Sequence, residues 1–253
     1  RNCEYNVVYC IILINQPKLY KMKKVTGYTI FEGKSPITGD DIIAVITLKS
    51  TNVKTGNMAS MWILHKDLSP IEASKEGKDE SICGMCPHRH NLGGACYVTL
   101  FQAPLQVWKS YHKGNYPKVN DMTIFEGMSV RFGAYGDPNV VPIDILVQLK
   151  SVVKNSTSYT HQWKTESDNE SLKAVSMASV DNKEEATLAI ENNWRYFRVT
   201  NDISDIDKAT EIVCPNTTRG IQCIDCGLCK GNTIKAKNIV IEVHGSKKKK
   251  FNE

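Results

Sequence analysis

The stretch MSVRFGAYGDPN, residues 128–139, joins an apolar and aromatic run to a turn made of glycine, aspartate and proline. Such a run, bounded by turn residues, predicts a β-strand that ends in a glycine turn. Residues 141–153 then repeat apolar side chains at helical spacing and place Pro142 in the first turn, where a helix tolerates proline. A strand followed by a helix is the unit from which α/β folds are built.

The same alternation extends along the chain in both directions. The other predicted elements are strands over residues 41–50, 59–67, 155–164, 173–182, 194–202 and 237–245, and helices over 97–114 and 183–194. Strands that alternate with helices indicate a parallel sheet with crossover helices, either open or curved into a partial barrel. We therefore predict an α/β fold, a partial (β/α) barrel with parallel strands and crossover helices, that carries a cysteine-rich metal-binding C-terminal segment.

In such folds the functional groups lie in loops at the carboxyl ends of the strands. Two cysteine groups follow predicted strands, and so do the Gly136–Asp137 turn, His161 and Asp181. We expect all of these features on one rim of the sheet.

Length and charge exclude several classes of protein. A chain of 253 residues with 41% hydrophobic residues can bury a sizeable core, which excludes a disordered or fibrous protein. The net charge is +5, but residues 247–250 are four lysines, so the body is nearly neutral and creates no strong field for nucleic acid. We predict one α/β metal-binding domain over residues 22–245 and a basic disordered tail over 246–253, which supports nucleic-acid binding only weakly.

Residues 1–21 are predicted to be an N-terminal extension of doubtful relevance, so Cys3 and Cys10 receive little weight. The apolar run over residues 6–14 is too short to cross a bilayer and lacks a cleavage site. We therefore expect no membrane association and a reducing cytoplasm, that of a bacterial cell or a phage-infected host. In that compartment clustered cysteines bind metal more often than they form disulfides.

The segment CPNTTRGIQCIDCGLC, residues 214–229, has the spacing C-x8-C-x2-C-x2-C. Closely spaced thiolates of this kind hold iron–sulfur clusters, and Cys214 followed by proline matches the Cys-Pro element of ferredoxins. Zinc ribbons use similar C-x2-C pairs. The segment predicts a closed metal site in which iron–sulfur is favoured over zinc. Its ligands are Cys214, Cys223, Cys226 and Cys229.

The upstream segment CGMCPHRHNLGGAC, residues 83–96, has the spacing C-x2-C-x9-C. Three thiolates leave a tetrahedral site one ligand short. His88 or His90 could complete a structural zinc site, or an external ligand could complete a metal cluster. An open position on iron would bind substrate or cofactor. The predicted ligands are Cys83, Cys86 and Cys96.

A cysteine triad after an early strand, then a helix, then a strand ending in a glycine-acidic turn resembles the core of the radical S-adenosylmethionine superfamily. In that family three cysteines hold a [4Fe–4S] cluster, S-adenosylmethionine chelates the open iron, and a GGE-like turn binds the amino group of that cofactor. The resemblance implies cofactor-binding roles for Gly133, Gly136 and Asp137 in FGAYGDP. The chain departs from the family's CxxxCxxC spacing and has aspartate where glutamate is commoner.

The pattern between Met22 and Gly245 is also similar to that of a group of phage and bacterial cysteine-cluster proteins. Other catalytic motifs are missing: GxxxxGK[ST], GxGxxG after a strand, and HExxH do not occur. Their absence disfavours P-loop nucleotide hydrolysis, Rossmann cofactor use and zincin proteolysis.

His161, in YTHQW, is the candidate catalytic residue, because an imidazole at a strand end can move a proton near neutral pH. A hydrogen-bonded core histidine between Tyr159 and Trp163 is an equal alternative. His244, at the end of the last predicted strand, has a similar standing and could instead reach the first metal.

Two functions remain open. The first is an iron–sulfur metalloprotein resembling radical S-adenosylmethionine enzymes, with an unidentified small-molecule or macromolecular substrate and an electron donor. Its second cysteine group would hold an auxiliary cluster or zinc. The alternative is a non-enzymatic zinc protein whose cysteines are structural and which binds a macromolecular partner such as nucleic acid.

Overall fold

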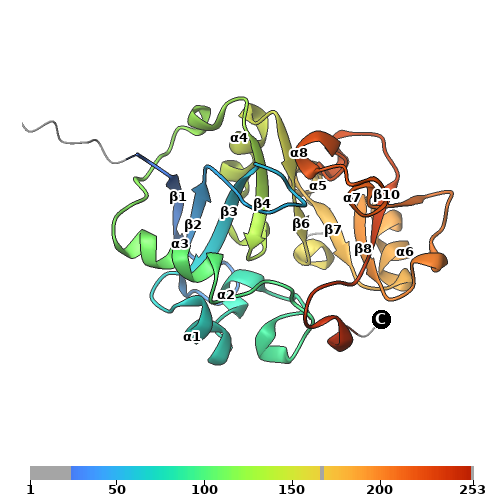
Figure 1. Cartoon of the computed structure of the whole chain (residues 1–253), viewed down its shortest axis with the longest axis horizontal. Helices are drawn as coiled ribbons and strands as arrows, with labels where there is room; N and C mark the ends of the chain where they lie inside the picture. The colour runs from blue at the N-terminus through green and yellow to red at the C-terminus, as the bar shows by residue number, and fades with distance from the viewer. Residues whose placement is uncertain (1–23, 166–167, 252–253) are drawn as a thin grey trace, which may run out of the picture.

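The computed structural model describes residues 24–165 and 168–251 and is a mixed α/β protein with two five-stranded sheets (Figure 1). The predicted extension over residues 1–21 lies outside the described residues. The strands are β1 (Gly27–Lys34), β2 (Asp41–Thr47), β3 (Ala59–His65), β4 (Ser129–Tyr135), β5 (Asn155–Thr157), β6 (Tyr159–Thr160), β7 (Met177–Val180), β8 (Tyr196–Thr200), β9 (Glu211–Val213) and β10 (Asn238–Glu242). The α-helices are α1 (Pro70–Lys75), α2 (Glu80–Cys83), α3 (Ala103–His112), α4 (Ile143–Val152), α5 (Glu170–Val175), α6 (Lys183–Glu191), α7 (Pro215–Arg219) and α8 (Cys223–Cys226).

The first sheet has the order β1-β2-β3-β4-β5 and is only partly parallel. β1 and β3 both pair antiparallel with β2, whereas β3, β4 and β5 run parallel. The parallel arrangement predicted from the sequence therefore holds from β3 onward and is wrong for the first strands. The connections over residues 35–40 and 48–58 contain no helix that could carry the chain back across the sheet, so these strands form a meander.

The second sheet has the order β6-β7-β8-β10-β9, and all of its strands are parallel. Only Ser158 separates β5 of the first sheet from β6 of the second. The main-chain N–H of Ser158 donates to the carbonyl of Cys229, and its carbonyl accepts from Met177, at 3.2 and 3.0 Å. The two sheets therefore meet at this residue.

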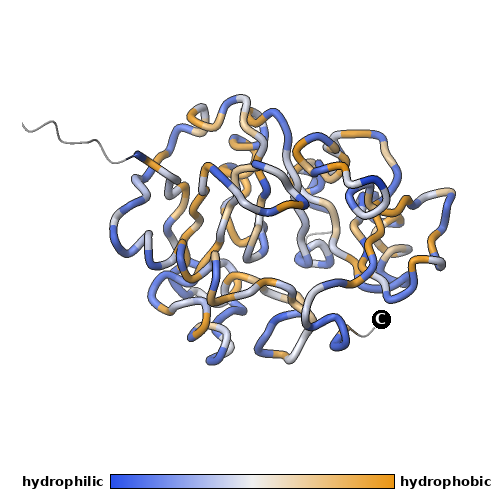
Figure 2. The backbone as a smooth tube through the Cα atoms, in the orientation of Figure 1, coloured by the Kyte–Doolittle hydropathy of each residue, from blue (hydrophilic) through white to orange (hydrophobic). Residues whose placement is uncertain are grey.

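The strands supply most of the residues of the hydrophobic core. Every residue from Ile42 to Ile46 in β2 is fully buried, and most of β3 is buried with it. A second core forms where Ala186 and Ala189 of α6 meet Trp163, Trp194 and β7. Figure 2 shows hydrophobic stretches along β2, β3 and β10. Within the described residues no helix is both long enough and apolar enough to span a membrane.

Candidate metal and cofactor site

A cavity of about 290 Å³ is bordered by the parallel strands of both sheets and by the upstream cysteine loop. Its walls are formed by side chains of β4, β5, β6, β7, β8 and β10. All three cysteines of the upstream group line this cavity, together with Gly133, Gly136, Asp137 and His161. The residues that the sequence predicts for the cluster and for the cofactor turn are thus brought together around one space.

Local hydrogen bonds fold the upstream cysteine loop back on itself. Cys83 ends α2, and Gly84 follows with φ of 53°, a conformation that favours glycine. The main-chain N–H of Cys86 donates to the carbonyl of Cys83 at 3.2 Å, and that of Cys96 donates to the carbonyl of His88 at 3.0 Å. These bonds return the third cysteine toward the first two.

Burial raises the pKa of the Cys83 thiol well above its usual value and that of Cys96 to about 11, and the neighbouring Cys86 adds to both shifts. Without a metal these two thiols are protonated at neutral pH, so a bound metal would have to displace their protons. Within the described residues no three cysteine sulfurs lie within 4.8 Å of one another.

Both histidines that the sequence suggests as a fourth zinc ligand have other partners. His90 places Nε2 at 2.9 Å from the carbonyl of Val98 and Nδ1 against Nζ of Lys247. His88 places Nε2 at 2.8 Å from Oδ1 of Asp181. His244 stacks on Tyr97, with 5.3 Å between ring centroids. The three thiols that line the cavity therefore have no fixed fourth ligand among these histidines.

The glycine turn after β4 requires its glycines. Gly133 and Gly136 have φ of 68° and 83°, and a Cβ on Gly136 would lie 2.7 Å from Cβ of Ile63. The carboxylate of Asp137 accepts hydrogen bonds from the main-chain N–H groups of Asn139 and His161 at 3.0 and 2.8 Å. Burial raises the pKa of Asp137 above its usual value. Asp137 therefore stabilises the turn through these hydrogen bonds and also lines the cavity.

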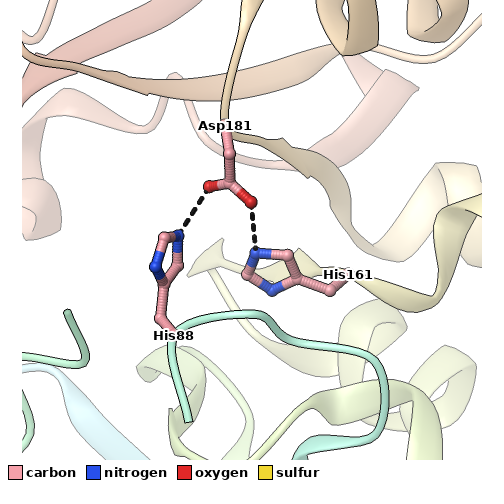
Figure 3. A group of neighbouring side chains, drawn as sticks. All are labelled: His88, His161 and Asp181. Atoms are coloured by element: carbon pink, nitrogen blue, oxygen red, sulfur yellow. Dashed lines mark hydrogen bonds and ion pairs between the residues drawn. The ribbon is translucent and has the colours of Figure 1, made fainter. Parts of the chain in front are cut away.

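His161 and His88 converge on one buried carboxylate (Figure 3). Nε2 of His161 lies 3.4 Å from Oδ2 of Asp181, which follows β7. Burial by itself lowers the pKa of His161, but the negative charge of Cys86 as a thiolate and the Asp181 carboxylate raise it well above its usual value overall. Burial by itself raises the pKa of Asp181, but its contacts with the two histidines lower it overall.

Within the second cysteine group, Cys214 directly follows β9, but Cys223 lies near the amino ends of β3 and β5, so the prediction of one shared rim is wrong for part of this group. The main-chain N–H of Cys223 donates to the carbonyl of Lys54, ahead of β3, and Nδ2 of Asn155, the first residue of β5, donates to the carbonyl of Cys223. The reason is topological: this group lies in the connection between the parallel strands β9 and β10, which has to return to their amino ends.

All four cysteines of the second group line a small cavity of about 20 Å³, and two of them also line the large one. Burial raises the pKa of Cys229 to about 12, and burial also raises that of Cys223. The four cysteines thus border one small space, although no three cysteine sulfurs in the described residues lie within 4.8 Å of one another.

Two features of the cavity were missed by sequence reasoning. Arg131 on β4 lines the cavity and donates to the hydroxyl of Tyr97 at 2.6 Å. The sequence signal that could have identified Arg131 is a charged residue within an otherwise apolar strand. The tail predicted to be disordered forms a short helical turn over Lys248–Lys250, and Phe251 is buried with its ring 5.3 Å from that of His88.

A scan against protein-family models, a search of curated proteins and a search of solved structures each find no match.

Proposed function

We propose that this protein is an iron–sulfur metalloprotein of the radical S-adenosylmethionine type. The observation that carries the proposal is the shared cavity, which brings the cysteine triad and the glycine-acidic turn together at the carboxyl ends of β3 and β4. The two features are separate in the sequence and meet through the parallel pairing of these strands. Such a meeting is what a cluster with a chelating cofactor requires.

The strand arrangement also supports the proposal. The parallel strands β3, β4 and β5 continue across Ser158 into β6, β7, β8 and β10, and helices connect β3 to β4, β4 to β5, β6 to β7 and β7 to β8. A partial (β/α) barrel has this order of strands, and its active centre lies at the carboxyl ends. We propose that the two sheets together form such a partial barrel.

In this proposal Cys83, Cys86 and Cys96 hold a [4Fe–4S] cluster, and the cavity admits S-adenosylmethionine beside it. The cluster, when bound, supplies the electron that cleaves this cofactor to a carbon radical. The protein itself would position the cofactor and border the space in which it reacts. Gly133 and Gly136 line the cavity, and their positive φ angles shape the turn that borders it.

The second group would hold an auxiliary cluster or a zinc ion, because it supplies four protein ligands of its own. A purely structural zinc at the first group is less well supported. Thiolates about 2.3 Å from a tetrahedral zinc lie about 3.8 Å apart, closer than any three cysteine sulfurs in the described part of the chain, so zinc at either group would require the sulfurs to move together. The histidines that would complete such a site also bind elsewhere.

Anaerobic reconstitution with iron and sulfide tests the proposal. We expect a coloured protein with about four irons and four sulfides at the first group, and more if the second also takes a cluster. Replacing Cys96 by serine should remove the metal of the first group, whereas replacing Cys226 by serine should leave it. Binding of S-adenosylmethionine should be lost in the first variant only. A colourless protein with one zinc in the first group and no sulfide would refute the proposal.

A further inference from the structure

We propose that His88, His161 and Asp181 form a binding site for one divalent transition-metal ion, separate from the cysteine groups. The three residues come from different parts of the chain: the upstream cysteine loop, the residue after β6 and the residue after β7. Their ligand atoms all lie within 4.8 Å of one another. Figure 3 shows both imidazoles directed at the carboxylate.

The separations match a coordination shell. Nε2 of His161 lies 3.4 Å from Oδ2 of Asp181, and Nε2 of His88 lies 2.8 Å from Oδ1. Nitrogen and oxygen ligands about 2.1 Å from a tetrahedral zinc lie about 3.4 Å apart. The His161 contact already has this spacing, whereas the His88 contact is a hydrogen bond that would have to widen by about 0.6 Å to admit the ion.

Nε2 of His161 and Oδ2 of Asp181 are buried and form a 3.4 Å ion pair with each other, but neither atom makes a hydrogen bond. The carboxylate belongs to a residue that is only 6% exposed. Buried polar atoms nearly always find a partner, and exceptions call for a reason such as an ion. A cation between these two atoms would satisfy both at once.

Outer contacts hold the ligands in place, as they do around metal sites generally. The main-chain N–H of Asp181 donates to Oε2 of Glu185, and that of His161 donates to Oδ2 of Asp137. The ring of His88 stacks against Phe251 at an interplanar angle of 29°. Each of the three ligands is therefore oriented by a contact outside the site.

Two imidazoles and one carboxylate suit zinc or ferrous iron better than calcium or magnesium, which prefer oxygen ligands alone. Three protein ligands leave a coordination position open. Because His88 and His161 line the large cavity, that position is available to water or to a substrate oxygen. In this site His161 is a metal ligand, which replaces the proton-transfer role that the sequence suggests.

The site needs none of the cysteines, although the Cys86 thiol lies beside His161. This independence allows a clean test with two forms of the full chain: the natural sequence, and a variant with serine at the three upstream cysteines. In both forms, bound zinc is counted by equilibrium dialysis and elemental analysis before and after Asp181→Asn or His161→Gln. The matched control is His112→Gln, an exposed histidine remote from the cavity.

We expect each of the two ligand variants to lose one zinc per chain, or to bind it more than about a hundredfold more weakly, in both forms. Iron and sulfide content of the natural form should not change, and zinc should raise the unfolding temperature of the His112→Gln chain by more than it raises that of the ligand variants. His88→Gln serves if the Asp181 variant does not fold. Equal zinc content in all variants, or a loss seen only when the cysteines are present, would overturn the site without touching the cluster proposal.

Discussion

The main-chain N–H of His161 donates a 2.8 Å hydrogen bond to Oδ2 of Asp137. This bond joins the turn after β4 to the segment after β6. The main-chain N–H of Asp137 in turn donates to the carbonyl of Ile82 in α2, at 2.7 Å. A single residue thereby connects the glycine turn, the upstream cysteine helix and the loop that bears the metal-ligand candidate.

Replacing Asp137 by alanine should therefore destabilise the protein even without metal. The N–H groups of Asn139 and His161 would lose their acceptor, at a cost of about 1–3 kcal/mol for each group left buried without a partner. Urea unfolding of the metal-free chain measures the effect. Asp137→Asn keeps a carbonyl oxygen and should cost clearly less. Equal stability of the alanine variant and the natural chain would show that the carboxylate serves only a ligand.

Gly136→Ala should cost more stability than Gly127→Ala, although both residues have positive φ. A Cβ at position 127 meets nothing within 4 Å, so only the left-handed backbone opposes it, by about 1–2 kcal/mol. A Cβ at position 136 would also press on Ile63, which adds about 1–3 kcal/mol. Chemical denaturation of both variants checks the difference, and equal losses would contradict the close packing of the turn.

Much of the fold could be predicted because its signals are local. Helices α4 and α6 show apolar spacing with Pro142 or Asn182 at their start, and β3, β8 and β10 are short apolar runs between turn residues. β1 was not predicted, because GYTIFEGK has glycine near both ends. β9 has three residues, too few for a periodic pattern.

The sequence could predict which cysteines are candidate metal ligands, but it could not predict where they lie in the fold. Cysteine spacing is a local property and identified both groups. The end of the sheet at which each group lies depends on chain direction in the connections, which is why part of the second group was misplaced. The contact of His88 with Asp181 joins residues that are 93 positions apart, and no local pattern records such a contact.

The stability of the second sheet should depend on pH through Glu211. Its carboxylate accepts from Arg198 at 2.9 Å and from the hydroxyl of Tyr196 at 2.9 Å, and both charged residues are buried. Burial by itself raises the pKa of Glu211, but these hydrogen bonds lower it overall below its ordinary value of 4.5. The stabilisation is therefore complete above about pH 4.5 and is lost as the pH falls through the lower folded value.

Glu211→Gln should accordingly remove about 3–5 kcal/mol at neutral pH, because it leaves Arg198 buried without its main counter-charge. The variant should also lose stability less steeply than the natural chain when the pH falls below 4.5. Unfolding free energies across this range measure both effects. Lys34→Gln is the control, because both side chains of its ion pair with Asp41 are exposed, at 67% and 41%, and an exposed ion pair contributes little to stability.

The C-terminal segment should detach more easily when Phe251 is replaced by alanine. Its ring is buried against His88, and burying a phenylalanine side chain contributes about 1.5–3 kcal/mol. Because the ring anchors a segment near the end of the described chain, the loss should appear as local opening and not as global unfolding. Trypsin cleavage at Lys248–Lys250 should then accelerate roughly tenfold to a hundredfold. Phe101→Ala, at a 64% exposed position, should leave that rate unchanged, and equal rates in the two variants would mean that the segment is held by Lys247 and His90 and not by Phe251.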